Sequence, residues 1–108
     1  KQKRQNMKEF TYCKNLRIPP NIVEMGYLDI LFDYVCSRIF ALQCRLRYAG
    51  IHLSFQVCSY NDNGDMGWVV NLQSSEKITV AAKLLHKEIK QKIKQIAKGG
   101  VKCQITTI

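Results

Sequence analysis

The sequence predicts one α+β domain in which two helices cover one face of a three-stranded antiparallel sheet. Two segments, 28–39 and 74–98, have apolar residues that recur every three or four positions, as on one face of an α-helix. Between them, apolar and polar residues alternate in three short segments, which is typical of half-buried strands. Because each helix has a single apolar stripe, both helices must pack on the apolar face of the sheet.

Composition and charge limit the classes of partner. The chain has 108 residues, of which 46% are hydrophobic, as expected for one globular domain. Seventeen Lys and Arg residues against eight Asp and Glu residues give a net charge of +9, which favours polyanionic partners such as nucleic acid. No apolar run reaches the roughly 18 residues that a membrane-spanning helix needs, so we expect no membrane partner.

The cysteines do not predict a metal site. Their number is odd and no two form a C-x-x-C pair, whereas a zinc site usually needs two close pairs of ligands. They fall on apolar positions of the pattern, so we interpret them as small buried residues in a reducing compartment, nuclear or cytoplasmic. We expect no cofactor. The five cysteines are Cys13, Cys36, Cys44, Cys58 and Cys103.

Residues 1–20 are predicted to be a basic N-terminal extension. Residues 1–9 are polar and mostly basic, which is typical of a flexible arm that serves in localisation or phosphate binding. Residues 10–18 have weak strand character. Pro19-Pro20 ends this segment, because proline lacks an amide hydrogen and disfavours helix in the residue before it.

The first helix is predicted to follow this proline pair. Asn21 is the candidate N-terminal cap, because its side chain can accept a hydrogen bond from a free amide of the first turn. We expect the helix to end near Arg38, where the apolar stripe stops. The stripe consists of Leu28, Leu31, Phe32, Val35 and Ile39.

The strands are predicted from a change of period. From residue 42 to residue 48, and again over 51–58 and 66–72, every second residue is apolar. Asn61-Asp62-Asn63-Gly64 is a strong hairpin signal, because Asn and Gly tolerate positive φ at little cost. These segments predict an antiparallel meander with one apolar face.

An alternative order depends on how residues 41–48 are interpreted. If they continue the first helix and residues 10–18 form a strand, the order becomes strand, helix, strand, strand, helix, strand. That order is the ferredoxin-like βαββαβ arrangement. The alternation over 42–48 favours the three-stranded meander.

The second helix is predicted over 74–98. Ser74 or Ser75 can cap its start, and Gly99-Gly100 supplies the flexible backbone that ends it. Its apolar stripe is Ile78, Ala82, Leu85, Ile89, Ile93 and Ile96, and its opposite face carries Lys83, Lys87, Lys90, Lys94 and Lys98. Residues 101–108 alternate and predict an added C-terminal strand. The chain therefore divides into the extension 1–20, a domain over 21–98 and a strand extension over 99–108.

The order helix, three strands, helix resembles the double-stranded-RNA-binding domain (dsRBD) over about residues 27–90. In that family the loop between the first two strands carries a histidine that enters an RNA minor groove, and His52 stands in this loop here. The family also has paired lysines at the start of the last helix, of which Lys77 matches one and Glu76 replaces the other. The resemblance implies a dsRBD-like fold and shape-dependent binding of double-stranded or structured RNA.

The predicted function is nucleic-acid binding through a basic helix face. The alternative is a degenerate dsRBD-like fold that acts as a protein-interaction or dimerisation module, in which the added strand pairs with an edge of another protein or of a second copy. No Ser-His-Asp arrangement, H-E-x-x-H motif or glycine-rich phosphate loop is present, so we expect no enzyme. The expected nucleic-acid contacts are His52, Lys77, Lys83, Lys87, Arg45 and Arg47.

Overall fold

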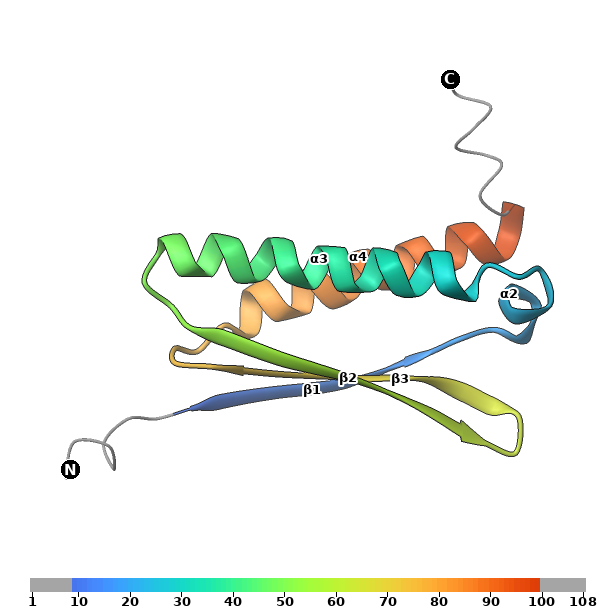
Figure 1. The fold of residues 1–108 in the computed structure, drawn as a ribbon, viewed down its shortest axis with the longest axis horizontal. Coiled ribbons are helices and arrows are strands. Elements are labelled where there is room, and N and C mark those ends of the chain that lie inside the picture. Colours follow the sequence, from blue (N-terminus) through green and yellow to red (C-terminus); the bar gives the residue numbers. More distant parts are fainter. Residues whose placement is uncertain (1–8, 100–108) are drawn as a thin grey trace, which may run out of the picture.

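Two helices lie side by side on one face of a three-stranded sheet (Figure 1). The computed structural model describes residues 9–99. All neighbouring strands are antiparallel, in the order β1-β3-β2, which confirms the predicted α+β class. The elements are β1 (Phe10–Arg17), α2 (Pro20–Glu24), α3 (Leu28–Tyr48), β2 (Leu53–Asp62), β3 (Asp65–Ser74) and α4 (Thr79–Gly99).

The strand predicted over 42–48 is wrong, because these residues are the last two turns of α3. Leu42 and Leu46 are four residues apart, so they fit both an alternating pattern and the helical stripe that contains Ile39. The other two alternating positions do not lie in the core, since Cys44 is exposed and Tyr48 is 95% exposed. The helix therefore ends ten residues beyond the expected end at Arg38.

The third strand of the sheet is β1, at the end of the chain that we assigned to an N-terminal extension. Its register with β3 runs from Phe10 opposite Ser74 to Arg17 opposite Gly67. The sheet therefore includes part of the predicted extension over 1–20. If the short helix α2 is left aside, the observed order from β1 to α4 is strand, helix, strand, strand, helix. This order agrees with the first five elements of the alternative βαββαβ prediction. The predicted sixth element, a strand over 101–108, lies outside the described residues.

Helix α3 begins later than predicted, because a glycine interrupts the segment. Gly26 has a φ of +78° and separates the short helix α2 from α3, so Asn21 does not cap the long helix. Instead, the side-chain amide of Asn21 donates a hydrogen bond of 2.8 Å to the carbonyl oxygen of Ala97. This bond joins α2 to the last turns of α4.

The predicted apolar stripe of α4 is confirmed, since all six of its residues are buried. The predicted start is wrong, because β3 extends to Ser74 and the helix begins at Thr79. Ser75 belongs to the connection between them, where it is tied to the residue that precedes β2. Its amide donates to the carbonyl of His52, and its hydroxyl accepts from the amide of His52, both at 3.0 Å.

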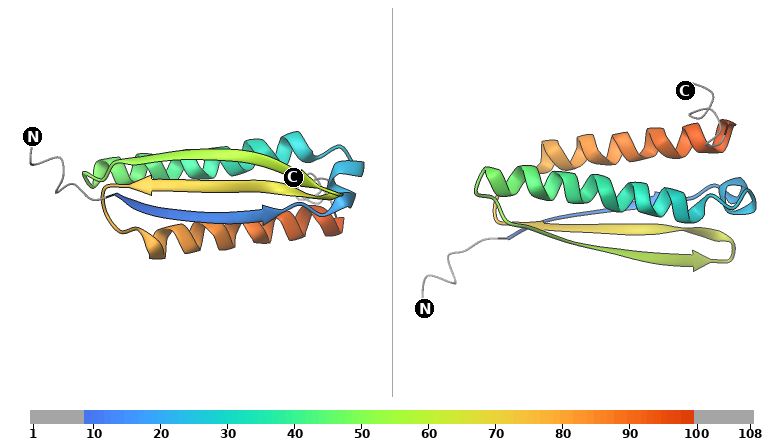
Figure 2. Two further views of the ribbon diagram at one scale, coloured as in Figure 1. Left: turned by 90° about the horizontal axis from the view of Figure 1, so that it is seen from below. Right: turned by 45° about the horizontal axis from the view of Figure 1, so that its top comes forward.

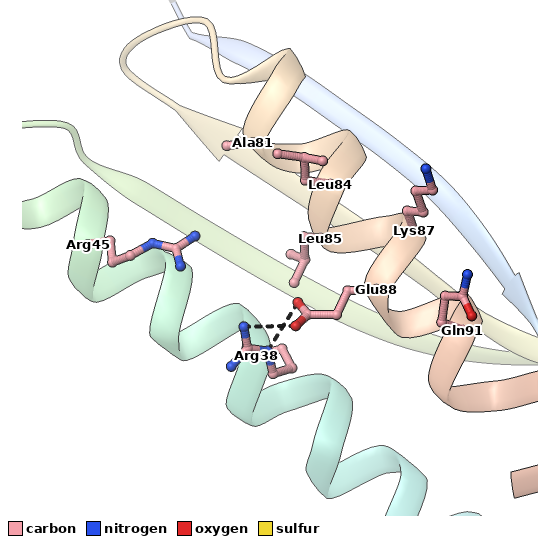
Figure 3. A pocket seen from close by; sticks show the side chains of 8 residues that line it. All are labelled: Arg38, Arg45, Ala81, Leu84, Leu85, Lys87, Glu88 and Gln91. Carbon is pink, nitrogen blue, oxygen red and sulfur yellow. Dashed lines mark hydrogen bonds and ion pairs between the residues drawn. The ribbon is translucent and has the colours of Figure 1, made fainter. Parts of the chain in front are cut away.

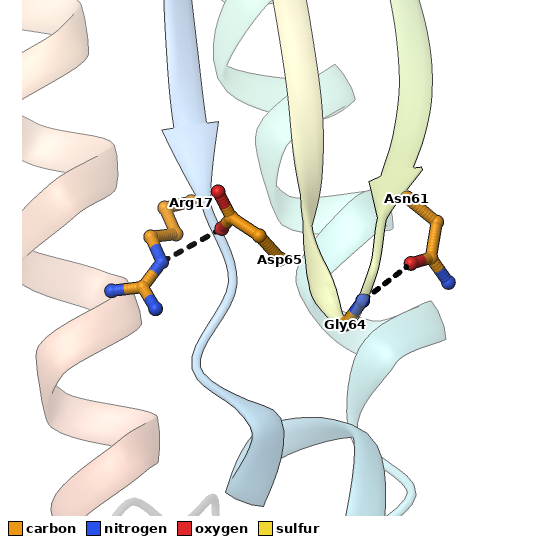
Figure 4. Close-up of polar contacts among 4 residues, drawn as sticks. All are labelled: Arg17, Asn61, Gly64 and Asp65. Atoms are coloured by element: carbon orange, nitrogen blue, oxygen red, sulfur yellow. Dashed lines mark hydrogen bonds and ion pairs between the residues drawn. The ribbon is translucent and has the colours of Figure 1, made fainter.

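The hairpin between β2 and β3 forms where the sequence predicts it. Asn63 and Gly64 both have positive φ, as a two-residue turn between right-handed twisted strands requires. The side chain of Asn61 accepts a hydrogen bond of 3.2 Å from the amide of Gly64, and Arg17 pairs with Asp65 at 2.9 Å (Figure 4). The second contact is an exposed ion pair, so it contributes little to the stability of the fold.

The core lies between the sheet and the two helices. Helix α3 covers the β2 side of the sheet, and α4 covers the β1 side (Figure 2). The prediction that the cysteines are buried is wrong for the four that the structure describes. Cys13, Cys44 and Cys58 are exposed, and Cys36 is half-buried. Cys103 lies outside the described residues. The core consists of Leu16, Ile18, Ile22, Leu31, Val35, Ile39, Leu42, Leu53, Trp68, Val70, Leu72, Ile78, Ala82, Leu85, Ile89, Ile93 and Ile96.

The close pairing of β1 with β3 predicts that Gly67→Ala destabilises the protein. A Cβ atom at this position would collide with the carbonyl oxygen of Leu16, which belongs to backbone and cannot rotate away. We expect a loss of about 1–3 kcal/mol in the free energy of unfolding, as for other forced overpacking. Urea denaturation measures it. Gln73→Ala, an exposed change on the same strand, should alter stability by less than about 0.5 kcal/mol. Equal stability of the two variants would contradict the prediction.

Candidate nucleic-acid interface

Five lysines line a groove between β1 and α4, which has a volume of about 410 Å³. We call it the basic groove. None of the residues that line it is acidic, so no carboxylate neutralises its lysines from within. Its lining consists of Tyr12, Lys14, Lys83, His86, Lys87, Lys90, Gln91 and Lys94.

Two local periodicities place these side chains on facing walls. In β1, Tyr12 and Lys14 share the helix-facing side of the strand with the buried Leu16, because side chains alternate between the two faces. In α4, the four groove lysines are spaced by four, three and four residues, which places them along one flank beside the buried stripe. From Lys83 to Lys94 the row is roughly 17 Å long at 1.5 Å per residue.

Burial, assisted by two lysines of the groove, favours the neutral form of His86. Burial lowers the pKa of His86, and the positive charges of Lys90 and Lys14 lower it further. Lys14 also lies over the ring of Tyr12, with its ammonium nitrogen 5.9 Å from the ring centroid, at the outer range of a cation–π contact. At neutral pH the groove therefore combines lysine ammonium groups with a neutral imidazole.

The structure divides the six predicted contact residues among different places. Lys83 and Lys87 line the basic groove as members of one helix flank. Arg47 and His52 line a smaller hollow of about 250 Å³ at the end of α3. Arg45 does not extend a strand surface as expected, because it belongs to the last turn of α3.

Lys77 precedes α4 and lines neither groove nor hollow. It is exposed and lies in the connection between Ser75 and the helix. The two hydrogen bonds between Ser75 and His52 hold this connection beside the loop that contains His52. The two positions that carry the dsRBD resemblance are thus on neighbouring segments, and neither lines the basic groove.

Arg45 faces a second groove, which lies between α3 and α4 (Figure 3). Here Arg38 and Glu88 form an ion pair of 3.1 Å across the two helices, so part of the positive charge is neutralised. Leu84, which is 63% exposed, adds apolar surface to this groove. Its mixed character makes it less suited to a polyanion than the basic groove.

Residues outside the predicted set complete the basic groove. Lys90 and Lys94 were visible in the sequence as members of the same helical row as Lys83 and Lys87. Lys14, Tyr12 and His86 were missed. Lys14 could have been found only after residues 10–17 were recognised as a strand beside α4, because no local pattern connects it with the lysine row.

The face of the sheet opposite the helices is not covered by any helix (Figure 1). Tyr60 is on this face by alternation, whereas Tyr12 and the buried Trp68 are on the helix-facing side. Proteins that bind single strands usually stack several bases on exposed aromatic rings. This face therefore lacks the stacking platform that single-strand binding favours.

Residues 9–99 show neither a metal site nor a membrane-spanning helix. No cluster of three or more His, Cys, Asp or Glu residues in this part of the chain could hold a metal ion. None of the described helices is both long and apolar enough to cross a membrane.

The lowered pKa of His86 predicts a specific dependence of stability on pH. The unfolded chain binds a proton at this residue more readily than the folded chain. The contribution of neutral His86 to the free energy of unfolding is therefore fully present above about pH 6.5, the ordinary histidine pKa. It is lost as the pH falls from there through the lower pKa that His86 has in the folded protein. Urea denaturation between about pH 8 and pH 5 should show this loss in the wild type and a smaller one in His86→Gln. The same profile in the wild type and in His86→Gln would contradict the assignment.

Comparisons with protein-family models, with curated proteins and with solved structures find no match to this chain. The dsRBD resemblance therefore stays a prediction. What the basic groove binds has to be inferred from its charge, its shape and the side chains that line it.

Proposed function

We propose that the protein binds duplex or structured RNA through phosphate contacts in the basic groove. The observation that carries this proposal is the convergence of five lysines from β1 and α4 in a groove whose lining contains no acid. Each lysine that neutralises a phosphate releases counterions from the nucleic acid, so such a surface favours binding to polyanions.

The chemistry of the lining favours recognition that does not depend on base sequence. Lysine binds phosphate as a point charge, whereas sequence-specific contacts in a DNA major groove usually need Arg, Asn or Gln at base edges. Gln91 is the one amide in the groove. The groove is therefore suited to the backbone of a nucleic acid rather than to its bases.

Duplex RNA is the ligand that fits this chemistry best. Its base edges are hidden in a deep, narrow groove, so proteins bind its phosphates and 2′-hydroxyls. The phenol of Tyr12 and the neutral imidazole of His86 offer hydrogen-bonding groups for hydroxyls beside the ammonium groups. The absence of a stacking surface on the open sheet face argues against a single-strand ligand.

The proposal predicts that Lys83→Gln with Lys90→Gln weakens binding and makes it less sensitive to salt. Loss of two phosphate contacts should lower the slope of log K against log salt by about 2. Fluorescence anisotropy with a duplex RNA of about 20 base pairs, at NaCl concentrations between about 50 and 200 mM, measures both quantities.

The matched control is Lys77→Gln with Lys98→Gln, which removes the same charge from two exposed lysines outside the groove. It should change the salt slope by less than half as much. Equal effects of the two double variants would show that only net charge matters and would contradict the assignment to the groove. Equal affinity for duplex RNA, duplex DNA and single-stranded RNA would contradict the choice of ligand.

A further inference from the structure

The two edges of the sheet differ in how they are protected. An exposed edge offers unpaired backbone groups to any passing strand, and natural proteins usually protect it with lysines, prolines or bulges. The edge strand β1 contains Lys14 and Arg17. The edge strand β2 is ten residues long and contains no lysine, arginine or proline.

Apolar side chains accompany the unprotected edge. Phe40, which is 52% exposed, contacts Phe55 of β2 with ring centroids 5.2 Å apart. Phe32, which is 37% exposed, contacts Trp68 at 5.3 Å, and the residue of β2 opposite Trp68 is the small Ser59. We call Phe32, Phe40, Phe55 and the outer edge of β2 the β2 edge patch. Aromatic surface and unpaired strand edge thus coincide on the α3 side of the molecule.

We propose that the β2 edge patch binds a second copy of this chain through antiparallel pairing of β2 with β2. Antiparallel pairing of two identical strands is symmetric about a twofold axis. Side chains of the helix-facing side, such as Phe55 and Val57, therefore lie beside helix-facing side chains of the other copy. Side chains of the open side, such as Gln56 and Cys58, lie beside open-side side chains. The result is a continuous six-stranded sheet, and Phe40 of each copy covers apolar surface of the other.

Charge placement favours a second copy despite the net charge of +9. The basic groove lies beside β1, at the opposite edge of the sheet from β2. Pairing through β2 therefore places the two basic grooves at the outer ends of the joined sheet, where repulsion between them is weakest. Pairing through β1 would bring them together.

Sedimentation velocity over micromolar to submillimolar concentrations tests the proposal on the full 108-residue chain. The wild type should dimerise reversibly. Cys58→Lys places an ammonium group in the middle of β2, opposite its own copy, and should raise the dimer dissociation constant at least about tenfold. Cys13→Lys is the matched control, because Cys13 is also an exposed cysteine on the open face of an edge strand, and it should leave dimerisation unchanged.

Thiol cross-linking locates the contact independently of any effect on folding. A variant that keeps Cys58 and replaces the other four cysteines by serine should give a covalent dimer with a short bifunctional thiol reagent. A variant that keeps only Cys13 should not. A monomer at every concentration, or a dimer that cross-links through Cys13 and tolerates Cys58→Lys, would overturn the proposal. Circular dichroism confirms that each variant is folded.

Discussion

The pairing of β1 with β3 is the contact on which the arrangement of this protein depends. It closes the sheet on the α4 side, supports the buried stripe of that helix, and places Lys14 beside the lysine flank of α4. The pairing depends in turn on Gly67, where the carbonyl of Leu16 occupies the space that a side chain would need. Without β1, the lysines of α4 would be a solvated row on a helix instead of one wall of a groove.

The lysines that suit the basic groove to a polyanion also repel one another. The isolated protein is therefore less stable than it would be if acidic and basic residues alternated along the groove. Like charges three or four residues apart on a helix cost about 0.2–0.5 kcal/mol per pair, and the α4 lysines form such pairs with no acid in the groove to offset them. Burial lowers the pKa of His86, and the positive charges of Lys90 and Lys14 lower it further. A phosphate bound as proposed would reduce the repulsion among these lysines and so stabilise the fold.

The sequence predicts the helices better than the strands, for a physical reason. The stripe of α4 spans five turns, so no other periodicity fits it, and all six of its residues are in the core. Residues 42–48 are too few to separate a period of two from one of 3.6, because Leu42 and Leu46 satisfy both. In β1 the alternation is weak because Lys14 occupies a helix-facing position at the rim of the groove. The four lysines of α4 were therefore visible as a helical row, whereas Tyr12 and Lys14 depended on the pairing of β1 with a strand that follows it by at least fifty residues.

The molecule keeps its charged and apolar surfaces at opposite edges of one sheet. Helix α4 brings lysines to the β1 edge, and α3 brings phenylalanines to the β2 edge. Because β3 separates these edges, a partner on one side leaves the other side free. A dimer formed through β2 would carry two basic grooves in fixed relative positions, and binding of one groove to a duplex would raise the effective concentration of that duplex at the other. Weak phosphate contacts in each groove would then add up along a ligand long enough to reach both, so affinity would depend on duplex length more than on sequence.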